Sequence, residues 1–244
     1  MQKKDYSSSS QTSGWQDSMK SQERTDMFKK IAVWGAIILT CVAGLGGLVY
    51  LADKNSSNTS APVEIANFPA VSENDIIVGD PKAQIAITEY SDFQCPACAS
   101  YNPILNQVLS EYKGKVKLVY RHFPLRGIHK NAIIAGQAGY AAEKLGKFSE
   151  MKDLLFEKQA DWEGLDDPRE VFEGYAQSIE LNVEEFRTIM NSPEAKKAVE
   201  AGEREAIGLG LNSTPSFFIG NKRIQPRGFE EFKNLIDEEL ASSR

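Results

Sequence analysis

The feature that most constrains this 244-residue chain is a stretch of 22 residues without a charge, from Ile31 to Ala52. As an α-helix it would be about 33 Å long, enough to cross a hydrocarbon core of about 30 Å. A cleaved signal peptide is the alternative, but the apolar region of such a peptide is only about 7–15 residues long, and no A-x-A cleavage site follows this stretch. The sequence therefore predicts an uncleaved transmembrane anchor at residues 31–52.

The charges on either side of this stretch predict its orientation. Arg24, Lys29 and Lys30 precede it, whereas Lys54 follows it directly beside Asp53. Because basic residues are retained on the cytoplasmic side, we expect a single-pass protein of the cell membrane with a cytoplasmic N-terminus and an extracytoplasmic C-terminal part.

Composition divides the rest of the chain into three parts. Residues 1–30 are rich in Ser and Gln without an apolar period, which predicts a disordered cytoplasmic tail. Residues 53–70 have the composition of a flexible linker. Residues 71–244 are numerous enough to form one domain with a core of its own.

The charge balance excludes nucleic acid as a partner. The chain has a net charge of −6, and residues 1–30 hold six basic and four acidic residues, which leaves 22 basic and 30 acidic residues for the remainder. A nucleic-acid-binding domain has a basic surface, and no basic cluster exists here. Three cysteines are also too few for a small domain held together by disulfides.

Hydrophobic periodicity predicts an α/β fold for the domain. Alternating, β-branched segments predict strands, and apolar residues spaced three and four apart predict helices. The expected order is a strand at 83–90, a helix at 102–112, a strand at 116–123, a helical region at about 128–208, strands at 215–219 and 222–225, and a closing helix at 229–240.

Three start signals divide the long helical region. Asp167-Pro168 followed by Glu170 fits an N-cap, a proline in the first turn and a capping box. Asn182 with Glu185 repeats the capping box, and Ser192-Pro193 repeats the cap and the proline. We therefore expect a helical domain inserted into the sheet.

The chemistry of the domain is predicted at Cys95-Pro96-Ala97-Cys98, between the first strand and the following helix. On a first helical turn, two thiols at positions i and i+3 are neighbours and can form a reversible disulfide. The partial positive charge of a helix N-terminus stabilises a thiolate. We expect the more exposed Cys95 to be the nucleophile and Cys98 to be the resolving thiol.

Three other interpretations of the two cysteines are open. A zinc site needs four ligands, but no further cysteine lies in the domain, and His122 and His129 do not have ligand spacing. A structural disulfide across four residues would stabilise little, because its effect grows with loop length. A Cu(I) site would also use two thiolates. We interpret His122 as structural, His129 as a surface residue and Cys41 as a small apolar residue of the membrane span.

Three segments resemble those of the DsbA-like thiol–disulfide oxidoreductases, and most closely their membrane-anchored members. They are EYSDFQCPAC (Glu89–Cys98), YRHFPL (Tyr120–Leu125) and TPSFFIG (Thr214–Gly220), and the resemblance covers about residues 76–240. It implies a thioredoxin fold with an inserted helical domain, in agreement with the order of elements predicted above.

The resemblance also implies roles for individual residues. Cys95 and Cys98 match the redox pair of the family, and Thr214-Pro215 matches the loop in which a cis-proline faces the disulfide and contacts the substrate. Glu89 matches the buried acid beneath the active site, which can relay a proton to or from Cys98. Strongly oxidising members carry a histidine between the cysteines, whereas this chain has Pro-Ala, so we expect a milder oxidant.

The function that follows is the introduction of disulfides into exported proteins by the Cys95–Cys98 pair. The expected partners are folding or unfolded exported proteins with free thiols, together with a quinone-linked membrane protein that reoxidises the pair. No nucleotide, flavin or metal motif is present, so no cofactor is expected. The alternatives are a reductase or isomerase of the same fold, and a thiol-based metal-binding or chaperone module without turnover.

Overall fold

The computed structural model describes residues 39–41, 44, 46–47 and 63–242, and the chain divides into two units after Ser60. Most of the predicted span at 31–52, and all of the predicted tail at 1–30, lie outside the described residues. Among those that are described, no helix is both long enough and apolar enough to cross a membrane.

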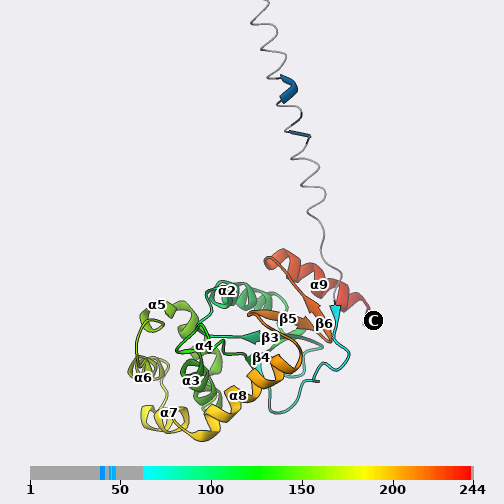
Figure 1. Ribbon diagram of the computed structural model, residues 1–244. Helices are drawn as coiled ribbons and strands as arrows, with labels where there is room; N and C mark the ends of the chain where they lie inside the picture. The colour runs from blue at the N-terminus through cyan, green and yellow to red at the C-terminus, as the bar shows by residue number, and fades with distance from the viewer. Residues whose placement is uncertain (1–38, 42–43, 45, 48–62, 243–244) are drawn as a thin grey trace, which may run out of the picture. The chain divides into compact units, whose positions relative to one another are not determined.

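The second unit is an α/β domain whose helices and strands follow the predicted order (Figure 1). Its elements are β1 (Val63–Glu64), β2 (Ile76–Gly79), β3 (Ile85–Ser91), α2 (Pro96–Glu111), β4 (Val116–His122), α3 (Ala132–Lys144), α4 (Phe148–Glu157), α5 (Gln159–Trp162), α6 (Arg169–Ser178), α7 (Val183–Met190), α8 (Pro193–Gly208), β5 (Ser216–Ile219), β6 (Lys222–Ile224) and α9 (Phe229–Ser242).

The sheet has the strand order β1-β6-β5-β3-β4-β2. β3 and β4 are parallel, and the other neighbouring strands are antiparallel. The two parallel strands are buried over most of their length, as expected for strands that are covered on both faces. The sequence analysis did not predict the edge strands β1 and β2, which are too short to show a period.

Helices cover the two faces of this sheet unequally (Figure 1). On one face, α2 and α9 pack on apolar residues of the sheet such as Ile87 and Phe217. On the other face, Tyr90 and Phe218 pack against α8 through Ala206 and against the chain segment that precedes β2. Because successive side chains of a strand point to opposite faces, neighbouring residues of β3 and β4 lie in two different environments.

The helices α3 to α7 gather beyond one end of the sheet around a core that includes Trp162 and Phe172 (Figure 1). Asn182 and Ser192 are N-caps as predicted, since their side chains accept hydrogen bonds from Glu185 N and Ala195 N. The predicted start of α6 is wrong by one residue: Pro168, not Asp167, occupies the N-cap position.

The folded domain begins earlier than predicted, because residues 63–70 are not a free linker. Val63 and Glu64 pair with β6, and Phe68 stacks on Phe218 with ring centroids 4.5 Å apart. The segment that follows is held by Arg121 of β4, whose guanidinium donates to the Ala70 carbonyl and binds Asp75. The predicted boundary at residue 71 would therefore remove chain that belongs to the core.

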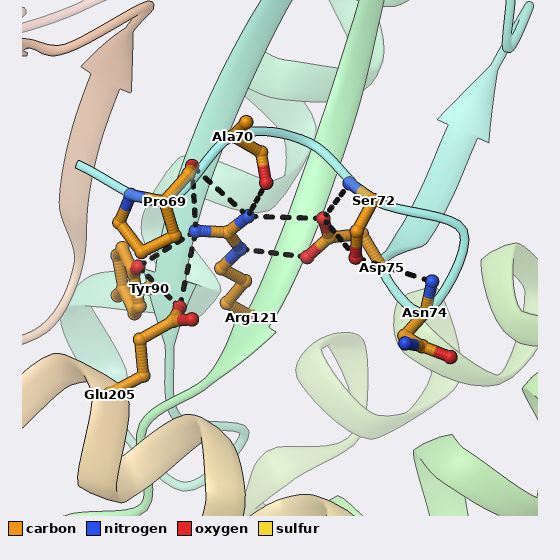
Figure 2. Close-up of polar contacts among 8 residues, drawn as sticks. All are labelled: Pro69, Ala70, Ser72, Asn74, Asp75, Tyr90, Arg121 and Glu205. Carbon is orange, nitrogen blue, oxygen red and sulfur yellow. Dashed lines mark hydrogen bonds and ion pairs between the residues drawn. The ribbon is translucent and has the colours of Figure 1, made fainter. Parts of the chain in front are cut away.

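Arg121 lies at the centre of a buried polar network (Figure 2). Its guanidinium binds both carboxylate oxygens of Asp75 at 2.8 and 3.0 Å and donates to the Tyr90 hydroxyl at 3.0 Å and to the Ala70 carbonyl at 3.2 Å. Glu205 of α8 lies 3.1 Å from the same guanidinium. Every partner is charged or a hydrogen-bond acceptor, so this buried cation is fully compensated.

Candidate active site

A tight turn after β3 positions the first cysteine. The carboxylate of Asp92 accepts hydrogen bonds from the backbone N–H groups of Gln94 and Leu125, each at 2.8 Å. The carbonyl of Asp92 accepts the N–H of Cys95 at 3.0 Å. These bonds fix the turn so that Cys95 becomes the N-cap residue of α2, with Pro96 in the first turn as predicted.

The environment of Cys95 favours its thiolate. Its pKa is lowered to about 5, mainly by the hydrogen bond from the Cys98 thiol and further by the backbone N–H groups of Cys98 and Ala97, against the opposing effect of burial. Free N–H groups at the start of a helix stabilise an anion in this position. Cys95 is 7% exposed, and its Sγ lies 3.5 Å from the carbonyl oxygen of Thr214.

Cys98 lies in the opposite situation, one turn further into α2. It is fully buried, and the pKa of its thiol is raised well above the ordinary value, first by desolvation and then by the hydrogen bond to Cys95 and the charge of Glu89. One thiol is therefore poised as a nucleophile and the other retains its proton. This is the difference that the predicted roles require, although the roles themselves remain a prediction.

Glu89 lies on β3, close enough to the two thiols for their charges and its own to interact. Its side chain is buried and accepts a hydrogen bond from the Ser91 hydroxyl at 2.8 Å. Desolvation raises the pKa of its carboxyl to about 7, against the lowering effects of Ser91 and of the Lys152 charge. A carboxyl with this pKa can both accept and release a proton near neutral pH, as the predicted relay requires.

The Thr214–Pro215 peptide bond is cis, as the resemblance implies. The loop that contains it connects α8 to β5 and brings the Thr214 carbonyl to Cys95. The buried Thr214 hydroxyl has no hydrogen-bond partner among the described residues. The loop therefore presents polar groups beside the reactive sulfur that an incoming peptide could bind.

Lys152 was not predicted as a residue of the site, although its side chain is only 1% exposed. Its ammonium binds the Asn102 and Asn106 amide oxygens of α2 and the Asp153 carboxylate, and its charge acts on Glu89. A signal was present in the sequence: in α4 the buried positions are 148, 151, 152, 155 and 156, so Lys152 occupies an apolar stripe. A lysine at such a position indicates a buried partner.

The two histidines differ in their surroundings. His122 is buried, its Nε2 has no partner among the described residues, and burial lowers its pKa to about 4, so it is neutral at physiological pH. The interpretation of His129 as a surface residue is wrong. Its Nδ1 lies 2.7 Å from the Asp92 carboxylate, because the loop after β4 folds back over the turn before Cys95.

No group of three or more potential metal ligands occurs within the described part of the chain. The two thiols of the motif are adjacent to a carboxyl, Glu89, and to the hydroxyl of Tyr120, which has no hydrogen-bond partner in the described residues. This set suits thiol and proton chemistry.

Comparison with known proteins identifies the family. The family model described as thioredoxin matches residues 71–238. A cysteine variant of α-DsbA1 from Wolbachia pipientis is 25% identical, with a TM-score of 0.61 over 69% of this chain and 91% of that one. The chain is a DsbA-like member of the thioredoxin family. Oxidised BdbD from Bacillus subtilis shares the fold, with a TM-score of 0.65 and 22% identity over 73% of this chain and 98% of that one.

The relatives that match by sequence are longer proteins named as Na(+)/H(+) antiporters. A Na(+)/H(+) antiporter NhaA 1 of Mycobacterium sp. (strain KMS) is 35% identical over 157 residues, which are 64% of this chain and 25% of the antiporter. The Na(+)/H(+) antiporter NhaA of Herminiimonas arsenicoxydans is 28% identical over 203 residues, 82% of this chain and 31% of that protein. The chain thus spans about a quarter to a third of the length of these curated relatives. The similarity assigns no antiporter activity to this chain.

Proposed function

We propose that this DsbA-like protein is a membrane-anchored, extracytoplasmic oxidase that introduces disulfides into exported proteins. The observation that carries the proposal is the contrast between the Cys95 thiol, whose pKa is lowered to about 5, and the Cys98 thiol, whose pKa is raised. A stable Cys95 thiolate is a good leaving group, so the reduced form is stabilised relative to the disulfide and the pair tends to give its disulfide away.

The reaction has two exchange steps. A substrate thiolate attacks Cys95 Sγ of the Cys95–Cys98 disulfide, the S–S bond breaks, and Cys98 leaves as a thiolate that takes up a proton. A second thiolate of the substrate then attacks the substrate sulfur of the mixed disulfide and releases Cys95 as a thiolate. The substrate loses two electrons and gains a disulfide, and the Cys95–Cys98 pair gains the two electrons.

Glu89 has a defined part in this scheme. The Cys98 thiolate would be costly inside the domain, because it is fully buried beside a carboxyl. With a pKa of about 7, Glu89 can hold the proton that Cys98 takes up, and accept it again when the disulfide re-forms. Cys98 and Glu89, both buried, are therefore not negatively charged at the same time.

Anchoring and reoxidation are further parts of the proposal. The uncharged segment 31–52 and the basic residues before it support a membrane anchor with the domain outside. The antiporter relatives are consistent with this arrangement, since 157 residues similar to this chain form part of a protein named a Na(+)/H(+) antiporter. A quinone-linked membrane protein would then accept the two electrons.

The redox equilibrium of the full-length chain in graded glutathione buffers, read by thiol trapping, tests the direction of electron flow. We expect a potential well above that of glutathione, closer to about −180 mV than to the value of about −120 mV of a strong oxidant, because Pro-Ala replaces the histidine of the strongly oxidising members. A value near −270 mV, as in thioredoxin, would contradict the oxidase and favour the reductase or isomerase. Thiols that never exchange would contradict every enzymatic function and leave the metal-binding or chaperone module.

A second experiment tests the topology. In intact cells, a thiol reagent that cannot cross membranes should label Cys95 after reduction, since the domain is expected on the outer side. Labelling that requires permeabilised cells would contradict the extracytoplasmic location. A Cys41→Ser background removes the remaining thiol outside the active site.

A further inference from the structure

A pocket of about 240 Å³ lies directly beside the cis-proline. Its apolar walls include Tyr101, Phe217 and Ile224, and its rim includes Pro215. Thr214, the residue before this proline, is the one whose carbonyl lies 3.5 Å from Cys95 Sγ. A peptide bound to Cys95 through a mixed disulfide would therefore place a neighbouring residue at this pocket.

The charge of the pocket is one-sided. Arg223 of β6 is the single charged residue among those that line it, and no carboxylate lines it. Arg223 belongs to residues 31–244, which hold 30 acidic and 22 basic residues. The remaining polar residues that line the pocket, Ser213, Ser216 and Gln225, are neutral. A single cation in a pocket of apolar and neutral polar residues is an arrangement that can recognise an anionic group.

Arg223 is oriented by the loop of the cis-proline. Its Nη2 donates a hydrogen bond to the Ser216 hydroxyl at 3.2 Å, and that hydroxyl donates to the Ser213 carbonyl at 2.9 Å. Within the described residues, no carboxylate lies within ion-pair distance of its guanidinium. A guanidinium has five N–H donors, so most of its donors are available to a ligand.

We propose that Arg223 binds the carboxylate of an aspartate or glutamate beside the reacting cysteine of the substrate. The inference rests on the proposed function and adds a substrate class to it: proteins whose cysteine is flanked by an acidic residue react fastest. An arginine and a carboxylate form two parallel hydrogen bonds, which fix the orientation of the peptide as well as attract it. The apolar walls would contact the methylene groups of the same side chain.

The test uses the oxidised full-length chain and peptides with one cysteine each. Two peptide thiols are oxidised to one peptide disulfide, and the Cys95–Cys98 disulfide is reduced to two thiols. Glutamate is placed in turn one or two residues before or after the cysteine, with glutamine and lysine at the same position for comparison. 2-Mercaptoethanol, which has neither a peptide chain nor a carboxylate, gives the exchange rate of a simple thiol.

We expect glutamate at one of these positions to react about tenfold faster than glutamine, the typical effect of one charge-assisted hydrogen bond. Arg223→Met should remove the preference, Arg223→Lys should retain part of it, and Arg223→Glu should reverse it in favour of lysine. Arg227→Met is the matched control, since Arg227 is an exposed neighbour that does not line the pocket. It should leave the preference unchanged.

Two results would overturn the inference while the proposed function stands. One is equal rates for glutamate, glutamine and lysine at all four positions, with brisk exchange in each case. The other is a glutamate preference that persists in Arg223→Met. Failure of 2-mercaptoethanol and of every peptide to exchange would instead contradict the proposed function, and the inference with it.

Discussion

The two faces of β3 and β4 differ in whether their buried polar groups have partners. On one face, Arg121 binds Asp75, the Tyr90 hydroxyl and Glu205, and each polar group has its partner. On the other face, one residue along each strand, Glu89 has a single neutral hydrogen-bond donor and the Tyr120 hydroxyl has no partner among the described residues. The same strands thus carry a compensated and an uncompensated site.

The difference separates stability from reactivity. A satisfied buried network contributes order and is costly to break, whereas an unsatisfied buried group holds a shifted pKa that chemistry can use. The compensated network holds the segment before β2 against the sheet (Figure 2). The uncompensated face lies beneath the two thiols. Substitutions on the uncompensated face should therefore change reactivity and proton binding, and substitutions on the compensated face should change stability.

The largest effect is expected from the cysteines of the uncompensated face. Cys95→Ser should abolish disulfide transfer to a dithiol peptide, because the attacking and leaving sulfur is lost. Cys98→Ser has no disulfide to transfer and should be inactive as well. When it is offered a peptide disulfide made of two single-cysteine peptides, its Cys95 thiolate attacks one sulfur, forms a mixed disulfide and releases the other peptide as a thiolate. This mixed disulfide should accumulate and be detected by mass spectrometry, because no Cys98 thiol remains to displace the bound peptide. Cys41→Ser is the control and should transfer at the wild-type rate. Wild-type turnover by Cys98→Ser would contradict the assigned roles.

Arg121→Met should be the most destabilising change on the compensated face. Removing one partner of a buried ion pair leaves Asp75 and Glu205 uncompensated, at a cost of about 3–5 kcal/mol. Urea unfolding measures the free energy of unfolding. Arg169→Met removes an exposed ion pair with Asp167 and should change it by less than about 0.5 kcal/mol. A loss below 1 kcal/mol for Arg121→Met would show that the network is not essential to the fold.

Glu89→Gln should change how stability depends on pH. The pKa of Glu89 is raised from 4.5 in the unfolded chain to about 7 in the folded one, so the folded state binds the proton more tightly. Relative to Glu89→Gln, the stability of the wild type should therefore fall by about 3 kcal/mol as pH rises from below 4.5 to above 7. The oxidised protein is used because neither thiol titrates there. Burial lowers the pKa of His122 from 6.5 to about 4, which acts in the opposite direction over this range, but it does so in both proteins and cancels in the comparison. The same pH dependence in both proteins would contradict the raised pKa of Glu89.

The sequence predicts most of what local patterns encode. The parallel strands β3 and β4, the helix that begins at Cys95-Pro96, and the caps at Asn182 and Ser192 follow from alternation, helical spacing and start signals. The short strands β1 and β2 do not, because a strand of two or four residues has no period to read. Their place is decided by pairing with β6 and β4.

The site divides in the same way. Cys95 and Cys98 were predicted from their position at a strand-to-helix junction, and Glu89 and Pro215 from the resemblance. Contacts between distant segments could not be predicted. One example is the contact between Lys152 of α4 and Asn102 of α2, which are 50 residues apart. The position of Arg223 beside the cis-proline loop could not be predicted either, because it depends on the pairing of β5 with β6.

Titration of the Cys95 thiol tests the central claim most directly, since the hydrogen bond from the Cys98 thiol and the N–H groups of the helix N-terminus should together lower its pKa. The rate of alkylation by iodoacetamide is followed as a function of pH in the reduced Cys41→Ser chain, with Cys95→Ser as the blank. The account predicts a midpoint near pH 5 that Arg121→Met leaves in place. A midpoint near 8.5, the ordinary value for a thiol, would contradict it.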